Sequence, residues 1–470
     1  MSQLLADCLN EIFEYLENDM VTLHSCLLVN RIWCEVSVKF FWRNIWKYRD
    51  SNYRTLIACL PTESKEILLK KGINISTLTS KPPIFNYASF CKILPIHRVG
   101  YKLKMILRHD KQYKQWQNLC NDSYILEQEI YKLYMSQIGS LRKLELILNM
   151  DWNIAFAFYP GAEDCLKNLS ELSYDSDIST ELFFQLSQIC HNILSLNINY
   201  RNHISKELTD LISVQENLKY LSINQFTDES LKQIITSIKN PNNLSKLSIY
   251  GEEQPSLLFI TKFTNLQELD LSIGKFEILQ HVIFPQLQIL KIYEKFELLT
   301  KFIENNGKNL RELYIIHEDY CYSNDSSNLA IAKSCPNLRK LFVGFKNNEL
   351  ETLKIAFKNC LYLETIKIWC GGNFLSEKEA LEMVLKYSHK NLYKVILYHQ
   401  DYTKSKLLPE ELESFFISWA NRVPQKSLSL LINDCDYYYN ARNSLNKSAE
   451  NMKIIEKYIK LGVIREFEVN

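Results

Sequence analysis

The feature that most constrains this chain is a seven-residue pattern that recurs along most of its length. The pattern begins most often with Asn, continues with an apolar residue and two variable residues, and closes with an apolar, a variable and an apolar residue. Its twelve copies are SLRKLEL from Ser140, NLSELSY from Asn168, NILSLNI from Asn192, NLKYLSI from Asn217, NLSKLSI from Asn243, NLQELDL from Asn265, QLQILKI from Gln286, NLRELYI from Asn309, NLRKLFV from Asn337, YLETIKI from Tyr362, NLYKVIL from Asn391 and SLSLLIN from Ser427. Most intervals between leading apolar residues are 21 to 29 residues, which matches the period of about 20–29 residues of leucine-rich repeats.

Each copy of the pattern predicts a short strand, and the spacer after it predicts a helix. The last two apolar residues are two positions apart, so they face the same side of a strand. In the spacer between Asn224 and Asn242, apolar residues recur at helical spacing, at Leu231, Ile234, Ile235 and Ile238. One such repeat leaves its apolar side exposed, whereas stacked repeats share one core. The sequence therefore predicts an α/β solenoid, a leucine-rich-repeat horseshoe of about twelve repeats over residues 136–470.

The composition argues against several classes of enzyme and nucleic-acid-binding protein. The 55 Lys and Arg residues balance 54 Asp and Glu residues, for a net charge of +1, whereas binding to a nucleic-acid backbone favours a basic excess. Only 11 of 470 residues are glycine, and no GxGxxG, GxxxxGK[ST] or GxSxG motif occurs. The nine His residues include no HxxxH or HExxH pair. We therefore expect no catalytic residues, metal, cofactor or nucleic-acid partner.

Cysteine usage and hydropathy indicate an intracellular setting. The 13 cysteines form no CxxC pair, and Cys190, Cys335 and Cys360 each stand three residues before a leading apolar position. The shared phase predicts that these thiols pack in the core as small apolar groups. The N-terminal stretch carries acids and lacks a basic leader, and no run of 18 apolar residues occurs. We expect a protein of the cytoplasm, the nucleus or both, without membrane contact.

The first 48 residues differ from the repeats and predict short amphipathic helices. Apolar stripes at helical spacing stand on both sides of a break at Asp19 and Thr22. The stretch resembles the F-box, a helical motif that binds the Skp-type adaptor of SCF ubiquitin ligases. Positions that match the family pattern are Leu4, Asp7, Ile12, Leu16, Leu23, Val29, Arg31, Trp33 and Trp42 or Trp46, while Leu5 stands where the family usually has Pro. The lead-in CPNLRKL at Cys335 resembles the cysteine-containing repeats of F-box leucine-rich proteins, and the arrangement resembles expanded fungal F-box families.

The resemblance implies a domain organisation and a set of partners. It implies an all-α F-box over residues 1–48, a helical linker or solenoid cap over 49–135, and the repeats beyond. Residues 96–135 have a helical pattern and no assigned role. By resemblance, the chain joins the Skp-type adaptor, and through it cullin and RING subunits, to a client protein that is ubiquitinated. The residues expected to contact the adaptor are Leu4, Leu5, Ile12, Leu16, Leu23, Val29, Trp33 and Trp42.

The client is expected on the strand side of the solenoid. Its exposed positions include the acids Glu145, Glu171 and Asp175 in the early repeats. In later repeats these positions carry aromatic side chains, which dominate many binding hot spots: Tyr250, Tyr293, Tyr314, Phe342, Trp369 and Tyr398. The alternative is that a C-terminal segment such as Tyr437–Tyr439 covers this stripe.

Two other functions remain open at this stage. One is a leucine-rich-repeat interaction scaffold outside the ubiquitin system, in which the N-terminal helices only cap the stack or dimerise. Leu5 in the place of Pro favours this alternative, because Pro fixes the backbone ahead of a helix. The other is a hydrolase with active-site residues scattered on loops, which the scarcity of glycine disfavours.

Overall fold

The computed structural model divides the chain into two compact units. The described residues are 6–73, 75, 83–110, 116–146, 156–175, 179–199, 204–224, 227–251, 257–272, 279–293, 299–316, 325–399, 407–423, 426–434 and 444–469. The first unit comprises residues 1–225 and 229–240, and the second comprises residues 226–228 and 241–470.

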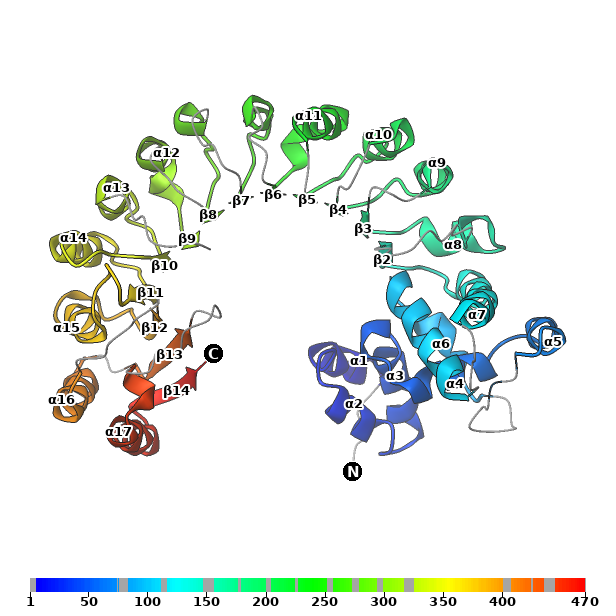
Figure 1. Cartoon of the computed structure of the whole chain (residues 1–470), viewed down its shortest axis with the longest axis horizontal. Helices are drawn as coiled ribbons and strands as arrows, with labels where there is room; N and C mark the ends of the chain where they lie inside the picture. Colours follow the sequence, from blue (N-terminus) through cyan, green and yellow to red (C-terminus); the bar gives the residue numbers. More distant parts are fainter. Residues whose placement is uncertain are drawn as a thin grey trace. The chain divides into compact units, whose positions relative to one another are not determined.

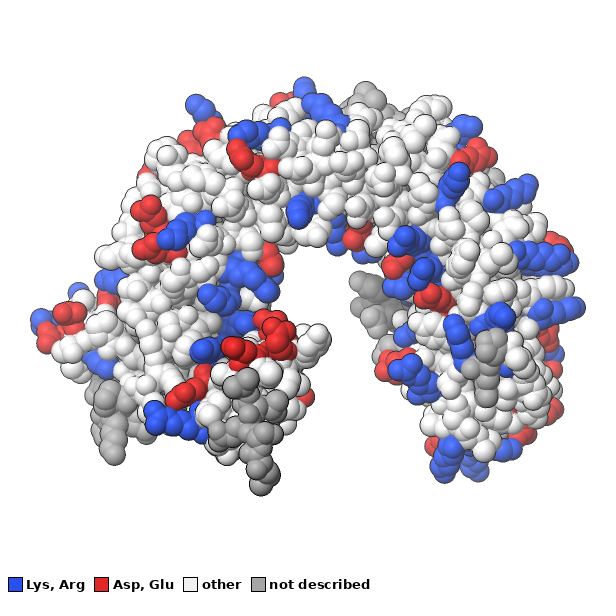
Figure 2. Space-filling model, turned by 180° about the vertical axis from the view of Figure 1, so that it is seen from behind, with Lys and Arg blue, Asp and Glu red and all other residues white. Residues whose placement is uncertain are grey.

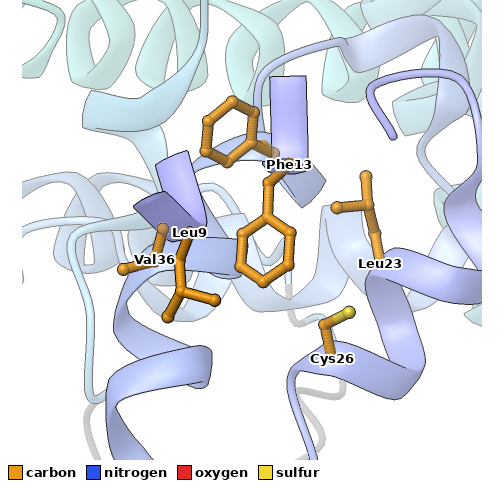
Figure 3. Close-up of a cluster of buried hydrophobic side chains, with 6 residues drawn as sticks. Leu9, Phe13, Leu23, Cys26 and Val36 are labelled. Atoms are coloured by element: carbon orange, nitrogen blue, oxygen red, sulfur yellow. The ribbon is translucent and has the colours of Figure 1, made fainter. Parts of the chain in front are cut away.

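Three short helices open the first unit, namely α1 (Ala6–Tyr15), α2 (Met20–Cys26) and α3 (Arg31–Phe41). They enclose a buried apolar cluster of Leu9, Phe13, Leu23, Cys26, Val36 and Phe40, with several of these side chains turned toward Phe13 in Figure 3. The expected break at Asp19 is confirmed, because its side chain accepts a hydrogen bond from the backbone N–H of Thr22 and caps α2. Asn30 caps α3 in the same way.

Further helices connect this bundle to the repeats. They are η1 (Ile45–Lys47), α4 (Asp50–Ala58), α5 (Thr62–Lys70), η2 (Tyr87–Phe90), α6 (Ile96–Asp110) and α7 (Trp116–Gln137). The predicted helical pattern is thus confirmed for residues 96–110 and 116–135, which lie in α6 and α7. Helix α5 begins after Pro61 and is followed by Gly72 at φ +70°, a backbone conformation that favours glycine after a helix.

The strands within each unit run parallel and follow one another in chain order (Figure 1). The first unit contains β1 (Ile93–Pro95), β2 (Lys143–Leu146), β3 (Glu171–Asp175), β4 (Ser195–Asn199) and β5 (Tyr220–Asn224). The second contains β6 (Lys246–Tyr250), β7 (Glu268–Ser272), β8 (Ile289–Tyr293), β9 (Glu312–Ile316), β10 (Lys340–Val343), β11 (Thr365–Cys370), β12 (Lys394–His399), β13 (Leu428–Asp434) and β14 (Ile464–Val469). Every predicted copy of the repeat coincides with a strand, from β2 to β13, so the predicted α/β solenoid architecture is confirmed within each unit.

Helical spacers follow the strands and cover one face of the sheet in each unit (Figure 1). They are α8 (Ala162–Leu166), α9 (Thr180–Ile189), α10 (Lys206–Ser213), α11 (Asp228–Ser237), η4 (Pro241–Asn243), η5 (Leu257–Lys262), η6 (Leu279–His281), α12 (Leu299–Asn306), η7 (Gly307–Asn309), α13 (Asp325–Ser334), α14 (Leu350–Asn359), α15 (Glu377–Tyr387), α16 (Pro409–Ala420), η8 (Leu445–Lys447) and α17 (Ala449–Lys460). The leading residues Leu244, Leu266 and Leu287 stand only 22 and 21 residues apart. In these short repeats the described part of the spacer forms a 3-10 helix, which needs fewer residues per turn.

The recurring Asn at the start of the pattern has a structural role. Its side-chain amide donates to a backbone carbonyl of the preceding repeat, in the pairs Asn265 to Asn242 (2.9 Å), Asn309 to Pro285 (2.8 Å), Asn337 to Lys308 (2.8 Å) and Asn391 to Leu361 (2.9 Å). These bonds satisfy carbonyl groups at the turn before each strand. Asn therefore recurs because it links neighbouring repeats.

Other polar side chains link repeats from inside the core. The Asn306 side chain accepts from the Phe284 backbone N–H at 2.6 Å and donates to the carbonyls of Val282 and Phe302. The cysteines of the repeat are buried as expected, and the Cys360 thiol donates to the Cys335 carbonyl at 3.3 Å. Burial raises the pKa of the Cys360 thiol to about 12. A packing role for these cysteines is therefore confirmed.

No helix in the described ranges combines the length and the apolar character that a membrane span requires.

Candidate functional site

The N-terminal bundle of the first unit exposes apolar side chains outside its core. They lie on α1, on α2 and in the turn after α2, with exposed fractions of 44% for Ile12, 90% for Tyr15, 76% for Val21, 76% for Leu28 and 55% for Val29. The acids Asp7, Glu11 and Glu14 are also exposed on α1. We call the five apolar residues the bundle patch. Several large apolar side chains exposed to water on one small bundle are unfavourable, so the bundle patch is a candidate contact surface.

The predicted adaptor-contacting residues divide into exposed and buried groups. Ile12 and Val29 belong to the bundle patch, whereas Leu16 and Trp33 are half-buried against the apolar cluster. Leu4 and Leu5 lie outside the described residues.

Leu23 and Trp42 correct the predicted surface. Leu23 is fully buried in the bundle core. Trp42 is 5% exposed and packs on Tyr48 and Tyr87, with ring centres 5.0 and 4.5 Å away. Leu23 packs inside the bundle and Trp42 packs between the end of α3 and the segments that follow it, so neither side chain is available to a partner. The pattern of apolar residues alone could not separate these roles, because the same helical spacing describes a buried and a surface stripe.

The bundle patch includes three residues that the sequence reasoning missed, Tyr15, Val21 and Leu28. Tyr15 follows Ile12 by three positions, so both lie on one face of α1. The available signal was Tyr15 itself, a large apolar residue that stands two positions after Phe13 and so points away from the side of α1 that buries Leu9 and Phe13.

The second candidate surface lies on the sheet face opposite the helices, which we call the open face. In the second unit, the predicted aromatic residues occupy two adjacent rows of this face. Tyr314 and Phe342 are register partners in the row between the two core positions of each strand. Trp369 and Tyr398 are partners in the next row toward the strand ends, where Tyr250 and Tyr293 also lie, each as the last residue of its strand.

Aromatic side chains on the open face contact one another across strands. Tyr250 and Tyr293 lie on β6 and β8, yet their ring centres are 5.8 Å apart, because the intervening row position on β7 carries the small Ser272. Tyr314 and Phe342 meet edge to face at 4.6 Å. Their side chains are half-buried. Each pair thus presents a rigid aromatic surface with little rotamer freedom left to lose on binding.

Trp369 corrects the predicted stripe, because it is only 3% exposed. Phe374 packs against its ring edge to face at 5.1 Å. A Cβ at Gly344 would lie 2.3 Å from the Trp369 ring, so the ring rests directly on glycine backbone. Trp369 therefore belongs to the packed interior of this repeat, and Tyr250, Tyr293, Tyr314, Phe342 and Tyr398 remain the partly exposed residues of the stripe.

Charged residues form a network between the aromatic pairs. The Glu268 carboxylate on β7 accepts from Lys291 at 2.7 Å and contacts Lys246 at 3.1 Å. Together these two cations hold the pKa of Glu268 below its ordinary value, although burial opposes them. Burial raises the pKa of Asp270, whose carboxylate accepts a hydrogen bond from Tyr250. This part of the open face is therefore polar and internally paired.

The acidic positions predicted on the early repeats are mostly occupied by internal contacts. Glu145 is 6% exposed and accepts from the indole N–H of Trp46 at 2.9 Å. Asp175 is 1% exposed and accepts from Asn199 at 3.1 Å, and Asn199 in turn accepts from Asn224 at 2.7 Å. Glu171 is partly exposed beside Arg142. The expectation of an exposed acidic stripe is therefore wrong for Glu145 and Asp175.

Three further observations concern metal ligands, surface charge and the C-terminal segment. In the described part of the chain, no group of three His, Cys, Asp or Glu side chains is placed to hold a metal ion. On the face drawn in Figure 2, basic and acidic side chains lie interspersed. The Tyr437–Tyr439 run, predicted as a possible cover of the stripe, lies outside the described residues.

Comparisons with known proteins find similar solved structures at low sequence identity. No family model and no curated protein matches the chain. The leucine-rich repeat-containing protein LegL7 from Legionella pneumophila is similar at a TM-score of 0.32 and 13% identity, over 70% of this chain and 93% of that one. The mouse RP105/MD-1 complex is similar at a TM-score of 0.34 and 13% identity, over 72% of this chain and 51% of the matched one.

Proposed function

We propose that the chain is the non-catalytic client-recognition subunit of an SCF-type ubiquitin ligase. In this proposal the N-terminal bundle docks on a Skp-type adaptor, which connects it to cullin and RING subunits. The repeats of the second unit hold a client protein by their open face. The chain contributes proximity and orientation, because holding a client near the ubiquitin-transferring subunits raises its effective concentration there.

The bundle patch is the observation that carries the proposal. Helices α1 to α3 already close an apolar core of their own, yet Val21 and Leu28 remain 76% exposed. Removal of each such aliphatic side chain from water contributes about 1.5–3 kcal/mol. A partner with an apolar groove would therefore gain most of its affinity here, and the F-box resemblance of the same segment names the Skp-type adaptor.

A second function is favoured by a different feature of the bundle. Leu23 and Trp42, which the F-box resemblance predicts as adaptor contacts, are buried. They would also be buried if the bundle were only a helical cap. In this alternative the chain is a protein-interaction scaffold outside the ubiquitin system, with the same client face.

The deciding experiment measures adaptor binding by variants of the bundle patch. Ile12→Asp in the full chain is expected to weaken binding to a purified Skp-type adaptor at least about tenfold, because it places a charge in an apolar contact. Leu16 is not a suitable position, since it packs against the bundle core. Unchanged titration curves for a folded Ile12→Asp variant would refute the bundle patch as the docking surface. Absence of binding by the folded, unmodified chain would favour the scaffold alternative.

The matched control is Ile283→Asp in the second unit. Ile283 is 64% exposed, so the same aliphatic-to-acid change is made at a site outside the bundle. We expect this variant to bind the adaptor as the unmodified chain does. Circular dichroism of both variants checks that the helical content is retained.

A further inference from the structure

Lys367 occupies an unusual position in the middle of the open face of the second unit. It lies on β11, and its direct register partners are Phe342 on β10 and Ile396 on β12. Its ammonium group lies 4.1 Å from the centre of the Tyr398 ring. Both neighbours in the ladder are therefore apolar, and the nearest polarised surface is an aromatic face, which attracts a cation through its quadrupole.

The neighbouring lysines of the same face have acidic partners, whereas Lys367 has none among the described residues. Lys340 pairs with Glu312 at 3.0 Å, and Lys394 pairs with Glu466 at 3.5 Å. Burial lowers the pKa of Lys367, in agreement with a half-buried cation that lacks a counter-ion. An ammonium group has three hydrogen-bond donors, so the site retains donors for an incoming anion.

We infer that the open face around β10 to β12 binds a client peptide segment through an anionic side chain, which pairs with the Lys367 ammonium group. Apolar residues next to that anion rest on Phe342 and Tyr398. The positive charge of Lys367 lies among apolar and aromatic side chains and determines which peptide binds, because an anionic side chain gains a partner there and a cationic one is repelled. This inference rests on the proposed function, in that it names the chemistry of the client for the same face.

The test uses four short fluorescein-labelled peptides that differ at one central position, which is Glu, phosphoserine, Gln or Lys, each between Leu and Phe. Their binding to the full chain is followed by fluorescence anisotropy. We expect the anionic peptides to bind about tenfold more tightly than the Gln peptide, with the preference reduced at high salt. The order of the Glu and phosphoserine peptides decides between carboxylate and phosphate.

Variants connect the preference to this residue. Lys367→Met keeps the aliphatic stem and is expected to abolish the preference, while Lys367→Arg retains it. Lys358→Met, at an exposed position of α14, is the matched control and is expected to leave the preference unchanged. Thermal melting of each variant shows whether the fold is retained.

The outcomes separate this inference from the proposed function. If the peptides bind without an anionic preference, or if Lys367→Met retains the preference, the inference is overturned. The proposal that the open face holds a client is then unaffected. If none of the four peptides binds, both the inference and the client face are contradicted. Adaptor binding by the bundle patch is measured independently of either result.

Discussion

Glu127 provides the most quantitative prediction, because a carboxyl group is buried between two helices of the first unit. It is 4% exposed on α7 and faces α6 at Gly100, where a Cβ would lie 2.9 Å from Glu127 Oε2. Glu127 Oε1 has no hydrogen-bond partner among the described residues. Burial raises the pKa of this carboxyl to about 8 from 4.5, although the charge of Lys104 opposes the shift.

The raised pKa makes the first unit less stable at alkaline pH. The folded state holds a proton that the unfolded state releases near pH 4.5, so the stabilising contribution is complete below that pH and is lost as pH rises through about 8. The change in the pKa of Glu127 from 4.5 to about 8 corresponds to about 4–5 kcal/mol, because each pKa unit corresponds to about 1.36 kcal/mol. The substitution Glu127→Gln removes the titration and keeps the shape, so it should stabilise the first unit by about 4 kcal/mol at pH 9 and by little at pH 5.

The assay is native-state hydrogen exchange of the α6 and α7 amides from pH 5 to pH 9, corrected for intrinsic exchange rates. Hydrogen exchange reports the local stability of α6 and α7, whereas a global unfolding curve would combine the stabilities of the two units. Glu63→Gln, at an exposed position of α5, is the control and should change protection by less than about 0.5 kcal/mol. A difference between Glu127→Gln and the unmodified chain that stays constant across this pH range would refute the reasoning.

Two more predictions concern side chains that link repeats. Asn306→Leu removes the three hydrogen bonds that this buried side chain makes to backbone groups and should destabilise the second unit by about 3 kcal/mol in urea unfolding; exposed Asn305→Leu should cost less than half as much. Iodoacetamide at pH 8 should label exposed Cys8 and spare Cys190 and Cys360 in the native chain, because burial raises the pKa of both thiols to about 12. Mass spectrometry reports the labelled sites, and rapid labelling of the two buried thiols would contradict their packing role.

The strands could be predicted from sequence because the same short sequence pattern forms the strand of each repeat. Leading Asn residues such as Asn309 and the LxL step after them recur with one structural meaning, the amide bond to the previous repeat and two core side chains. Strands β1 and β14 lie outside the twelve predicted copies of the repeat, because Ile93–Pro95 and Ile464–Val469 lack this signature. They pair with the outermost patterned strands through backbone hydrogen bonds that any sequence can supply.

The sites could be predicted only in part, because exposure depends on contacts between segments. Trp369 and Tyr398 occupy equivalent positions of neighbouring strands, yet Phe374, from the loop after β11, covers Trp369 alone. That Lys367 has no acidic partner among the described residues likewise depends on which neighbouring strands carry acids. Sequence spacing gives the face of a residue and not what packs over it.

The most direct test of the central claim is the mass of the complex formed by the full chain and a purified Skp-type adaptor, measured by light scattering after size-exclusion chromatography. The proposed function predicts a one-to-one complex that Ile12→Asp disrupts and Ile283→Asp does not. Separate elution of the folded chain and the adaptor at micromolar concentration would contradict it and leave a repeat scaffold whose N-terminal helices cap the first unit.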